Sequence, residues 1–540
     1  MKTECLPFSQ IPQTSKLFAD YLSQFPKVER FYPRSPYFNS WLHDESTRVR
    51  YAADRREQVA DVLERQNRSW NASAKTLENL ARFRAGALAS VTGQQVGLFG
   101  GPAFSIYKAL SAVRLASEAT KNGINTVPVF WLATEDHDLA EVDHVFVPDA
   151  DFTFQRLKVE TNAPEDTPVG RIQFGSEIEG VVNRAVELLG ESEIVAALRE
   201  AYRPGETFGS AFAKFFSRVL GDWGVIILDS SDPELHRIAQ PVYQAAAERA
   251  EELDDLLIAR GKELESAGYH QQVKVTSSST LLFYMGEGKR TVVHRKVNSS
   301  NGSDFVIGNE KVTKAELQQR IASAPENFSA NVLLRPLVQD FLLLTLAYFG
   351  GPAEVAYFAQ AAVVYQAILG RVTPILPRFS ATIVEQKPAS LMEKHHLRLP
   401  DLFHGEDVLR QKLATRTLPQ DLQEAFRNAT ASVESSLEQI RNSLQQLDVT
   451  LVDSSRIAES KIRYQLDELK AKAGRAELRK TEVLTRHARV LSQALYPDKD
   501  LQEREVGAVY FLGRHGVQLL EELYNHINPE CVDHQVISLS

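Results

Sequence analysis

The sequence predicts an α/β fold in which a parallel-sheet core precedes an α-helical, antiparallel coiled-coil domain. Residues 126–133 (TVPVFWLA) form a β-branched and aromatic run, which is typical of a parallel strand covered on both faces. Residues 87–91 form another apolar run, which leads into a glycine-rich loop and then a helix opening near Pro102. Beyond Lys387 the apolar residues change to heptad spacing, which indicates coiled-coil helices.

The composition is that of an ordinary globular chain. It has 540 residues, 43% hydrophobic and 24% charged, a length that suggests about three domains. The net charge of −9 argues against nucleic acid or an anionic membrane surface as the main partner. The longest apolar stretch, residues 341–349, is too short to span a bilayer, and the first residues lack an apolar signal segment. We therefore expect a cytoplasmic protein without a membrane or nucleic-acid partner.

The only two cysteines are Cys5 and Cys531. They cannot form a framework of several disulfides or a multi-thiolate zinc site, so no zinc site and no other metal centre is evident. Their scarcity fits a reducing cytoplasm. We expect Cys5 to lie near an unanchored terminus, where it would be a poor nucleophile.

The remaining core elements follow from apolar runs and their breakers. We expect helices up to about residue 85, a β-rich insert over about residues 150–175 and a second insert over 268–330 that holds a hairpin around residues 286–288. Two helices, 337–348 and 354–367, are expected to join at a Gly-Gly-Pro sequence. Further expected elements are strands at 145–147, 224–228 and 372–383 and helices at 191–201 and 207–220.

The C-terminal third divides into two parts. The apolar residues Val433, Leu437, Ile440, Leu444, Leu447 and Leu451 step by four and three along one helix, and Ile462, Leu466, Leu469, Ala473 and Ala476 continue the seam on a second. A turn over 448–454 would make these helices antiparallel arms, which usually dimerise or brace a domain. We thus divide the chain into a core (1–386), a coiled-coil domain (387–500) and a C-terminal part (501–540), in which a helix over 501–526 and a strand over 536–539 return to the core.

Four ionisable residues follow the buried run at 126–133. They are Glu135, Asp136, His137 and Asp138. Ligands bind at the carboxyl ends of strands in open α/β sheets, so this cluster is a candidate catalytic group. His137 would act as a general base, while Asp136 or Asp138 would bind Mg²⁺ or a substrate amine. The alternative is that these residues cap the short helix at 139–142 with solvated charges.

The loop after residues 87–91 forms a second candidate site. A glycine loop and a helix N-terminus at a strand end bind anions and nucleotides, although neither a P-loop nor a GxGxxG pattern is present. Backbone and side-chain donors here would hold a nucleotide or substrate, and Lys108 would reach a phosphate. The alternatives are that the glycine loop is only a packing turn, that the glutamine side chains cap the loop, and that Lys108 is solvated. The candidate binding residues are Thr92, Gly93, Gln94, Gln95, Gly101, Ser105 and Lys108.

Two arginines complete the candidate set. Arg335 begins a polar series that continues with Gln339, Asp340, Glu354 and Gln360, and a buried structural network explains this series as well as a binding site does. Arg378 would clamp a carboxylate through two parallel hydrogen bonds.

Several blocks taken together resemble one known family. They are TGQQVGLFGGPAFSIYKA (92–109), PVFWLATEDHDLAEVDH (128–144), GVIILDSSDP (224–233), NVLLRPLVQDFLLLTLAYFGGPAEVAYFAQ (331–360) and ILPRFSATIVE (375–385). In this order they are similar to the cysteine ligase family of bacillithiol biosynthesis, over almost the whole chain. The resemblance implies a Rossmann-like core with small connecting inserts and a homodimer formed through the coiled coil. It also implies the last step of the pathway, in which L-cysteine is joined to the amine of glucosaminyl-malate.

Such a reaction sets requirements for the site. Forming an amide from a free carboxylate is uphill in water, so we expect ATP and Mg²⁺ to activate the cysteine carboxylate. His137 would deprotonate the amine, and Arg378 or Gln94 would hold the malyl carboxylates. Two alternatives stay open: a nucleotidyl- or glycosyl-type transferase on the same fold, and a non-catalytic coiled-coil scaffold that binds a nucleotide or a thiol metabolite.

Overall fold

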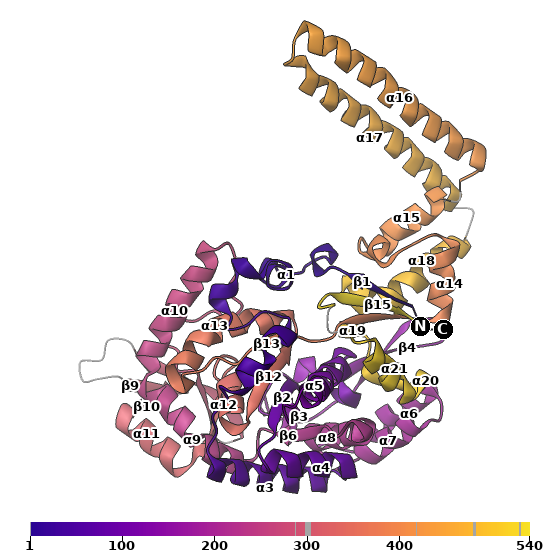
Figure 1. Ribbon diagram of the computed structural model, residues 1–540. Helices are drawn as coiled ribbons and strands as arrows, with labels where there is room; N and C mark the ends of the chain where they lie inside the picture. Colours follow the sequence, from indigo (N-terminus) through magenta and orange to yellow (C-terminus); the bar gives the residue numbers. More distant parts are fainter. Residues whose placement is uncertain are drawn as a thin grey trace.

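The computed structural model describes residues 2–286, 288–296, 304–416, 418–478, 482–528 and 531–539. A globular body carries one long helical hairpin that projects away from it (Figure 1). Among the described residues, no helix combines the length and apolarity that a membrane span requires.

The described part of the body is built on a five-stranded parallel sheet with the order β13-β12-β2-β3-β6. Its strands are β2 (Leu88–Gln94), β3 (Thr126–Leu132), β6 (Ile226–Asp229), β12 (Thr345–Gly350) and β13 (Ile375–Pro377). The chain moves outward from β2 through β3 to β6 and then returns to the other side of β2, where it adds β12 and β13. The strand order therefore reverses between β2 and β12, and ligands bind at such a switch point in open parallel sheets.

Helices cover both faces of this sheet, which explains why its strands are apolar throughout. Val129 faces one core cluster and Phe130 the other, because side chains alternate along a strand. The cluster on the first face includes side chains of α3 (Ala53–Ser69), α4 (Ala74–Arg84), α9 (Pro233–Glu248), α10 (Ala250–Ser266), α12 (Arg335–Leu342) and α13 (Pro352–Leu369). The cluster on the second face includes side chains of α5 (Phe104–Lys121), α6 (Glu177–Leu189), α7 (Glu193–Ala201) and α8 (Phe208–Val219).

Two small antiparallel sheets lie in or next to the expected inserts, and of the described strands only β5 falls within residues 150–175. The hairpin predicted around residues 286–288 is confirmed, and it belongs to a sheet with the order β10-β9-β8-β7-β11. The predicted strand at 145–147 is also confirmed and pairs with β5. These strands are β4 (His144–Pro148), β5 (Phe154–Lys158), β7 (Leu282–Gly286), β8 (Lys289–Lys296), β9 (Asp304–Ile307), β10 (Glu310–Thr313) and β11 (Phe328–Ala330), and α11 (Lys314–Ser323) follows β10.

The predicted helix over residues 337–348 is wrong in its second half. Helix α12 ends at Leu342, and residues Thr345–Gly350 form strand β12 between β13 and β2. A short run that is apolar on every side fits a buried strand as well as a buried helix, so periodicity could not distinguish them.

The N-terminus differs from the expected helical segment. Residues Lys2–Leu6 form strand β1 before α1 (Lys16–Ser23) and α2 (Leu42–Ser46). Strand β1 pairs with β15 (His534–Ser538), which confirms a C-terminal strand and joins the two ends of the chain (Figure 1). Strand β15 also pairs with β14 (Ala381–Val384).

The helix predicted over residues 501–526 is instead three short helices. These are α19 (Gln502–Glu505), α20 (Ala508–His515) and α21 (Gln518–His526). Gly516 ends α20 with φ +72°, a left-handed conformation that glycine adopts without steric cost.

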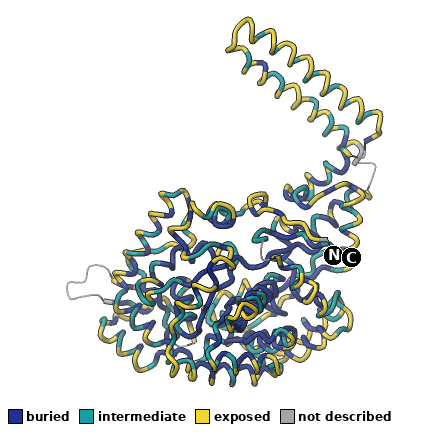
Figure 2. Tube along the Cα trace, viewed as in Figure 1, coloured by how far each residue is buried: buried dark blue, intermediate teal, exposed yellow. Residues whose placement is uncertain are grey.

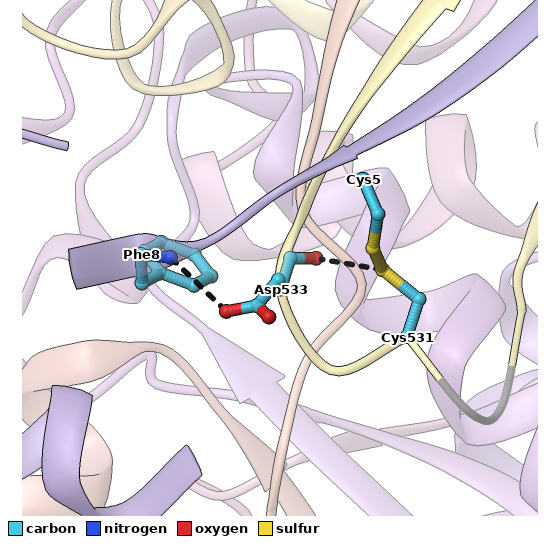
Figure 3. The surroundings of a disulfide bond; sticks show 4 residues. All are labelled: Cys5, Phe8, Cys531 and Asp533. Atoms are coloured by element: carbon cyan, nitrogen blue, oxygen red, sulfur yellow. Dashed lines mark hydrogen bonds between the residues drawn. A yellow bond between two sulfur atoms is a disulfide. The ribbon is translucent and has the colours of Figure 1, made fainter. Parts of the chain in front are cut away.

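A disulfide joins Cys5 in β1 to Cys531 just before β15 (Figure 3). Next to it, the Phe8 backbone N–H donates a hydrogen bond of 3.0 Å to the Asp533 carboxylate. The expectation that Cys5 lies on an unanchored terminus is therefore wrong. The bridge links residues 526 positions apart, and so it restricts the unfolded chain as well as the folded one.

The projecting hairpin confirms the predicted coiled-coil arms. Helices α16 (Gln420–Leu447) and α17 (Leu451–Leu478) are joined by a short turn, where Thr450 N–H and Oγ1 donate to the Asp448 carboxylate. Figure 2 shows that most of this hairpin is exposed. At its base lie α14 (Gln386–Lys394), α15 (Glu406–Arg416) and α18 (Glu482–Leu495).

Candidate functional site

A cavity of about 740 Å³ opens at the carboxyl edge of the central sheet. The loops that follow β2, β3, β12 and β13 line it on the sheet side, and residues of the β7–β8 hairpin and of α12 also contribute. It therefore lies at the switch point between β2 and β12. The predicted site residues that line it are Gly93, Gln94, Gln95, Lys108, Glu135, Asp136, Arg335 and Arg378.

Lys108 lies at the base of this cavity and is buried. Its ammonium group donates to the Gly93 carbonyl at 2.8 Å and to Gln94 Oε1 at 3.0 Å, and it lies 2.5 Å from Glu354 Oε2. Burial lowers the pKa of Lys108 despite the nearby carboxylate. The alternative of a solvated lysine is thus wrong, and the ammonium is already fully engaged within the protein.

Glu354 is the partner that sequence reasoning assigned only to a polar network. It stands in the first turn of α13 and accepts hydrogen bonds from Tyr348 Oη at 2.6 Å and from the Gly351 N–H at 2.8 Å. Burial alone would raise its pKa, but Lys108 and these donors lower it below the ordinary value. The carboxylate stays ionised, and it connects the β12–α13 unit to the β2–α5 unit.

The acidic side of the cavity is organised by Gln95. Its amide N–H₂ donates to Asp136 Oδ2 at 2.7 Å and to Glu141 Oε2 at 2.6 Å. Asp136 also lies 3.8 Å from Arg290, a residue of the β7–β8 hairpin that sequence reasoning missed. Arg290 donates to Ser329 Oγ and to the Ala330 carbonyl, so it is fixed by its own insert.

The other members of the strand-end cluster lie differently. Glu135 lines the cavity and lies 3.1 Å from His236, a buried residue of α9 that the sequence did not single out. His137 does not line the cavity; it is about one-third exposed, and its Nδ1 lies 3.4 Å from Arg290. Asp138 is exposed and also lies outside the cavity.

The predicted anion-binding corner at the start of α5 is filled by the protein itself. The Ala103 N–H donates to the Val506 carbonyl at 2.9 Å, and the Ala508 N–H donates to the Gly101 carbonyl at 3.0 Å. Gly101 and Ser105 therefore lie beside the C-terminal segment rather than in the cavity. Thr92 is also outside the cavity, because its hydroxyl group donates to the Phe349 carbonyl between β2 and β12.

A second glycine-proline helix start takes the place of this corner. Gly351, Pro352 and Ala353 line the cavity at the N-terminus of α13, which is 18 residues long. The two sequences look alike, but the first turn of α13 lines the cavity, and there the Gly351 N–H donates to the Glu354 carboxylate. The positive end of this helix dipole therefore acts on the cavity.

The two predicted arginines differ in how their charge is balanced. Arg378 is buried, and it donates to the Glu503 carboxylate at 2.6 Å and to the Phe379 carbonyl at 2.9 Å. Arg335 instead donates to two neutral acceptors, Gln339 Oε1 and Tyr357 Oη, each at 3.1 Å. Arg335 is thus the better-placed cation for a ligand carboxylate.

Comparison with known proteins identifies the family. Residues 1–379 match the family model "Bacillithiol biosynthesis BshC, N-terminal Rossmann-like domain", and residues 381–539 match "Bacillithiol biosynthesis BshC, C-terminal coiled-coil domain". The chain belongs to the BshC family. The resemblance drawn from its sequence blocks is therefore confirmed, as is the Rossmann-like fold with a coiled-coil domain.

Relatives named "Putative cysteine ligase BshC" match this chain from end to end. The protein from Koribacter versatilis is 48% identical, with 99% of this chain and 100% of the relative covered. The protein from Solibacter usitatus is 38% identical with the same coverage, and that from Salinibacter ruber is 32% identical over 97% of this chain and 96% of its own.

In this BshC-family chain, Arg378 is held by a buried network that the C-terminal segment completes. Glu503 of α19 also accepts from Ser380 Oγ and from the Ala381 N–H, both at 2.8 Å. His534 of β15 is hydrogen-bonded through Nδ1 to Ser380 and through Nε2 to Thr382. Burial lowers the pKa of His534 from 6.5 to about 4, so the imidazole is neutral in the folded protein at neutral pH.

Replacement of Lys108 tests the buried pair. Lys108→Met leaves the Glu354 carboxylate buried without its cation, so we expect the free energy of unfolding to fall by about 3–5 kcal/mol. Lys108→Met combined with Glu354→Gln removes both charges and should recover most of this loss. Urea denaturation of the two single variants and the double variant measures the coupling, and strictly additive losses would contradict the pair.

The low pKa of His534 predicts a loss of stability in acid. The folded pKa of about 4 lies below the ordinary value of 6.5. The contribution of the neutral imidazole to the free energy of unfolding is therefore fully present above pH 6.5. It is lost as the pH falls towards 4, and the loss reaches up to about 3 kcal/mol. Urea denaturation from pH 7 to pH 4 should show a shallower pH dependence for His534→Gln than for wild type. The half-exposed His526→Gln serves as the control, and an equal slope in all three proteins would refute the assignment.

Proposed function

We propose that the chain joins L-cysteine to the amine of glucosaminyl-malate as the last step of bacillithiol biosynthesis, and that the cavity at the switch point is its active site. The observation that carries this proposal is the order of charges along the sheet edge. Arg378 follows β13, Glu354 and Lys108 lie beside β12 and β2, and Glu135 follows β3. With strands about 4.8 Å apart, the outer two positions are roughly 14 Å from each other.

This order suits a substrate that carries both carboxylates and an amine. The malyl carboxylates would bind on the cationic side, where Arg335 has neutral hydrogen-bond partners. The glucosamine ammonium would bind on the side of Glu135 and Asp136, whose carboxylates offer opposite charge. Phe104, Trp131 and Tyr348 also line the cavity and would select the cysteine side chain by shape. Within the described ranges, no group of three His, Cys, Asp or Glu side chains could hold a metal for the thiol.

Activation of the cysteine carboxylate calls for a nucleotide, and we propose ATP with Mg²⁺. The residues fit phosphate binding at the N-terminus of α13, where Gly351–Ala353 border the cavity and the helix dipole favours anions. The carboxylates of Asp136 and Glu141 would take Mg²⁺ together with the phosphates, because Mg²⁺ sites usually combine one or two carboxylates with substrate oxygens. ATP supplies the free energy for amide formation.

We also propose that two chains dimerise through the α16–α17 hairpin. No residue of α16, all of which the structure describes, is buried, although the helix packs against α17. Ile440, Ile457 and Leu469 are 50%, 58% and 56% exposed. Two antiparallel helices can cover only one seam, so a second hairpin from another copy of the chain would bury the rest.

The ligase proposal is tested by direct detection of product. Purified protein is incubated with L-cysteine, glucosaminyl-malate, Mg²⁺ and ATP, and the products are analysed by mass spectrometry beside an ATP-free control. We expect ATP-dependent bacillithiol together with AMP or ADP, because amide formation is uphill without activation. Serine in place of cysteine should give little product. If the folded protein forms no bacillithiol, the ligase proposal is overturned for this chain acting alone.

The dimer proposal predicts a molar mass of twice one chain by light scattering coupled to size-exclusion chromatography. Ile457→Glu together with Leu469→Glu places charge on the exposed apolar face and should give the mass of a single chain. Ser443→Glu adds one negative charge at an exposed polar position of the hairpin and should leave the mass unchanged. A wild-type protein with the mass of one chain at micromolar concentration would refute the dimer.

A further inference from the structure

The carboxylate of Glu135 contacts the buried His236 on the side away from the cavity. Glu135 follows β3, and its Oε1 is enclosed by the protein at 3.1 Å from His236 Nε2. The two side chains are 13% and 2% exposed, so the contact is sealed from solvent. Because Glu135 lines the cavity while Oε1 is enclosed, Oε2 is the oxygen that a ligand can reach.

His236 is itself fixed on its other side. It lies in the second turn of α9, and its Nδ1 is hydrogen-bonded to Tyr243 Oη at 3.1 Å, two turns further along the helix. The rings of His236 and Tyr243 also pack together, with their centroids 6.0 Å apart. The hydrogen bond at Nδ1 and the ring contact with Tyr243 hold the imidazole in one orientation, in which Nε2 lies 3.1 Å from Glu135 Oε1.

The surrounding charges favour the protonated form of His236. Burial alone would lower the pKa of His236, but the charge of Glu135 and the contact with it raise the pKa above 6.5. Arg171 opposes this effect on the His236 pKa, and the charge of Arg290 lowers the pKa of Tyr243. Asp229 at the end of β6 is buried and has a raised pKa, which its proximity to Glu135 increases.

We propose that Glu135 is the catalytic base for the amine of the acceptor substrate and that His236 is its positioning residue. This inference rests on the ligase function proposed above. The substrate ammonium gives one proton to Glu135 Oε2, so that an N–H bond breaks and an O–H bond forms. The proton stays on Oε2, so the Glu135 side chain changes in charge from −1 to 0, while His236 lies against the other oxygen, Oε1. The amine keeps its electron pair and attacks the activated cysteine carboxyl carbon.

This assignment differs from the role that the sequence suggested for His137. His137 lies outside the cavity lining, and its Nδ1 faces the Arg290 guanidinium, which is a hydrogen-bond donor. Glu135 instead has one oxygen towards the cavity and the other 3.1 Å from His236 Nε2. A base needs both a path to the substrate and a fixed position, and within the described strand-end cluster Glu135 combines the two.

The experiment compares Glu135→Gln, His236→Gln and the double variant with wild type, with the half-exposed His526→Gln as control. We expect Glu135→Gln to lower kcat by about 10²–10⁴-fold and His236→Gln by a smaller factor of at least about 10-fold. The double variant should be no slower than Glu135→Gln, because the two residues act as one unit. The deficit of His236→Gln should shrink as the pH rises and the amine loses its proton in solution. KM for glucosaminyl-malate should change little in His236→Gln, and His526→Gln should match wild type.

Binding and folding are measured on the same proteins, so that loss of the fold, loss of substrate binding and loss of ligation can be distinguished. Urea denaturation identifies a variant that is merely unfolded, and titration calorimetry with glucosaminyl-malate reports the contact with its ammonium. If wild type binds this compound and Glu135→Gln binds it at least 10-fold more weakly, Glu135 contacts the amine even where no ligation occurs, and only the ligase function fails. Folded Glu135→Gln and His236→Gln variants with wild-type affinity, kcat and pH profile would overturn the present inference.

Discussion

The buried ion pair between Lys108 and Glu354 is the contact on which the site depends. It joins α5 to α13 across the point where the strand order reverses, and it draws in the carbonyl of Gly93 and the side chain of Gln94. A lysine at this depth is tolerated because three acceptors surround it. The pair consequently fixes the separation of the loops that follow β2 and β12. The cavity lies between these two loops, so the pair also fixes its width.

A second constraint comes from the C-terminal return. The coiled-coil excursion leaves the body after β14 and comes back before β15, which are neighbours in one sheet, so both of its ends are anchored at one place (Figure 1). On the way back, Glu503 neutralises Arg378 and the Val506 carbonyl occupies the N-terminus of α5. The same segment therefore occupies two groups that would bind anions in an isolated Rossmann-like core, namely Arg378 and the N-terminus of α5. Ligand chemistry is directed towards Arg335 and the N-terminus of α13 instead.

Local patterns predicted the strands at 126–133 and 224–228, the hairpin insert and the coiled-coil arms, because each has a clear apolar period or turn. They did not predict β12, whose residues are apolar on all sides, or β1, which forms only because β15 is available as a partner. At the site, position after a strand correctly brought Glu135, Asp136, Gln94 and Gln95 to the cavity. His236 and Arg290 were missed because each belongs to an element whose approach to the strand ends is a tertiary effect.

The pairing of charges within the cavity limits how a substrate can bind. Lys108 and Arg378 are compensated by carboxylates of the protein, so a substrate carboxylate would have to compete with Glu354 or Glu503 for them. Arg335 is half-buried, and its two described hydrogen bonds are to neutral acceptors rather than to a carboxylate. A carboxylate that binds there gains more than it would at either paired cation. An acceptor substrate anchored at Arg335 would extend along the strand ends towards Glu135. Its amine would then lie beside the Glu135 carboxylate, whose other oxygen contacts the buried His236.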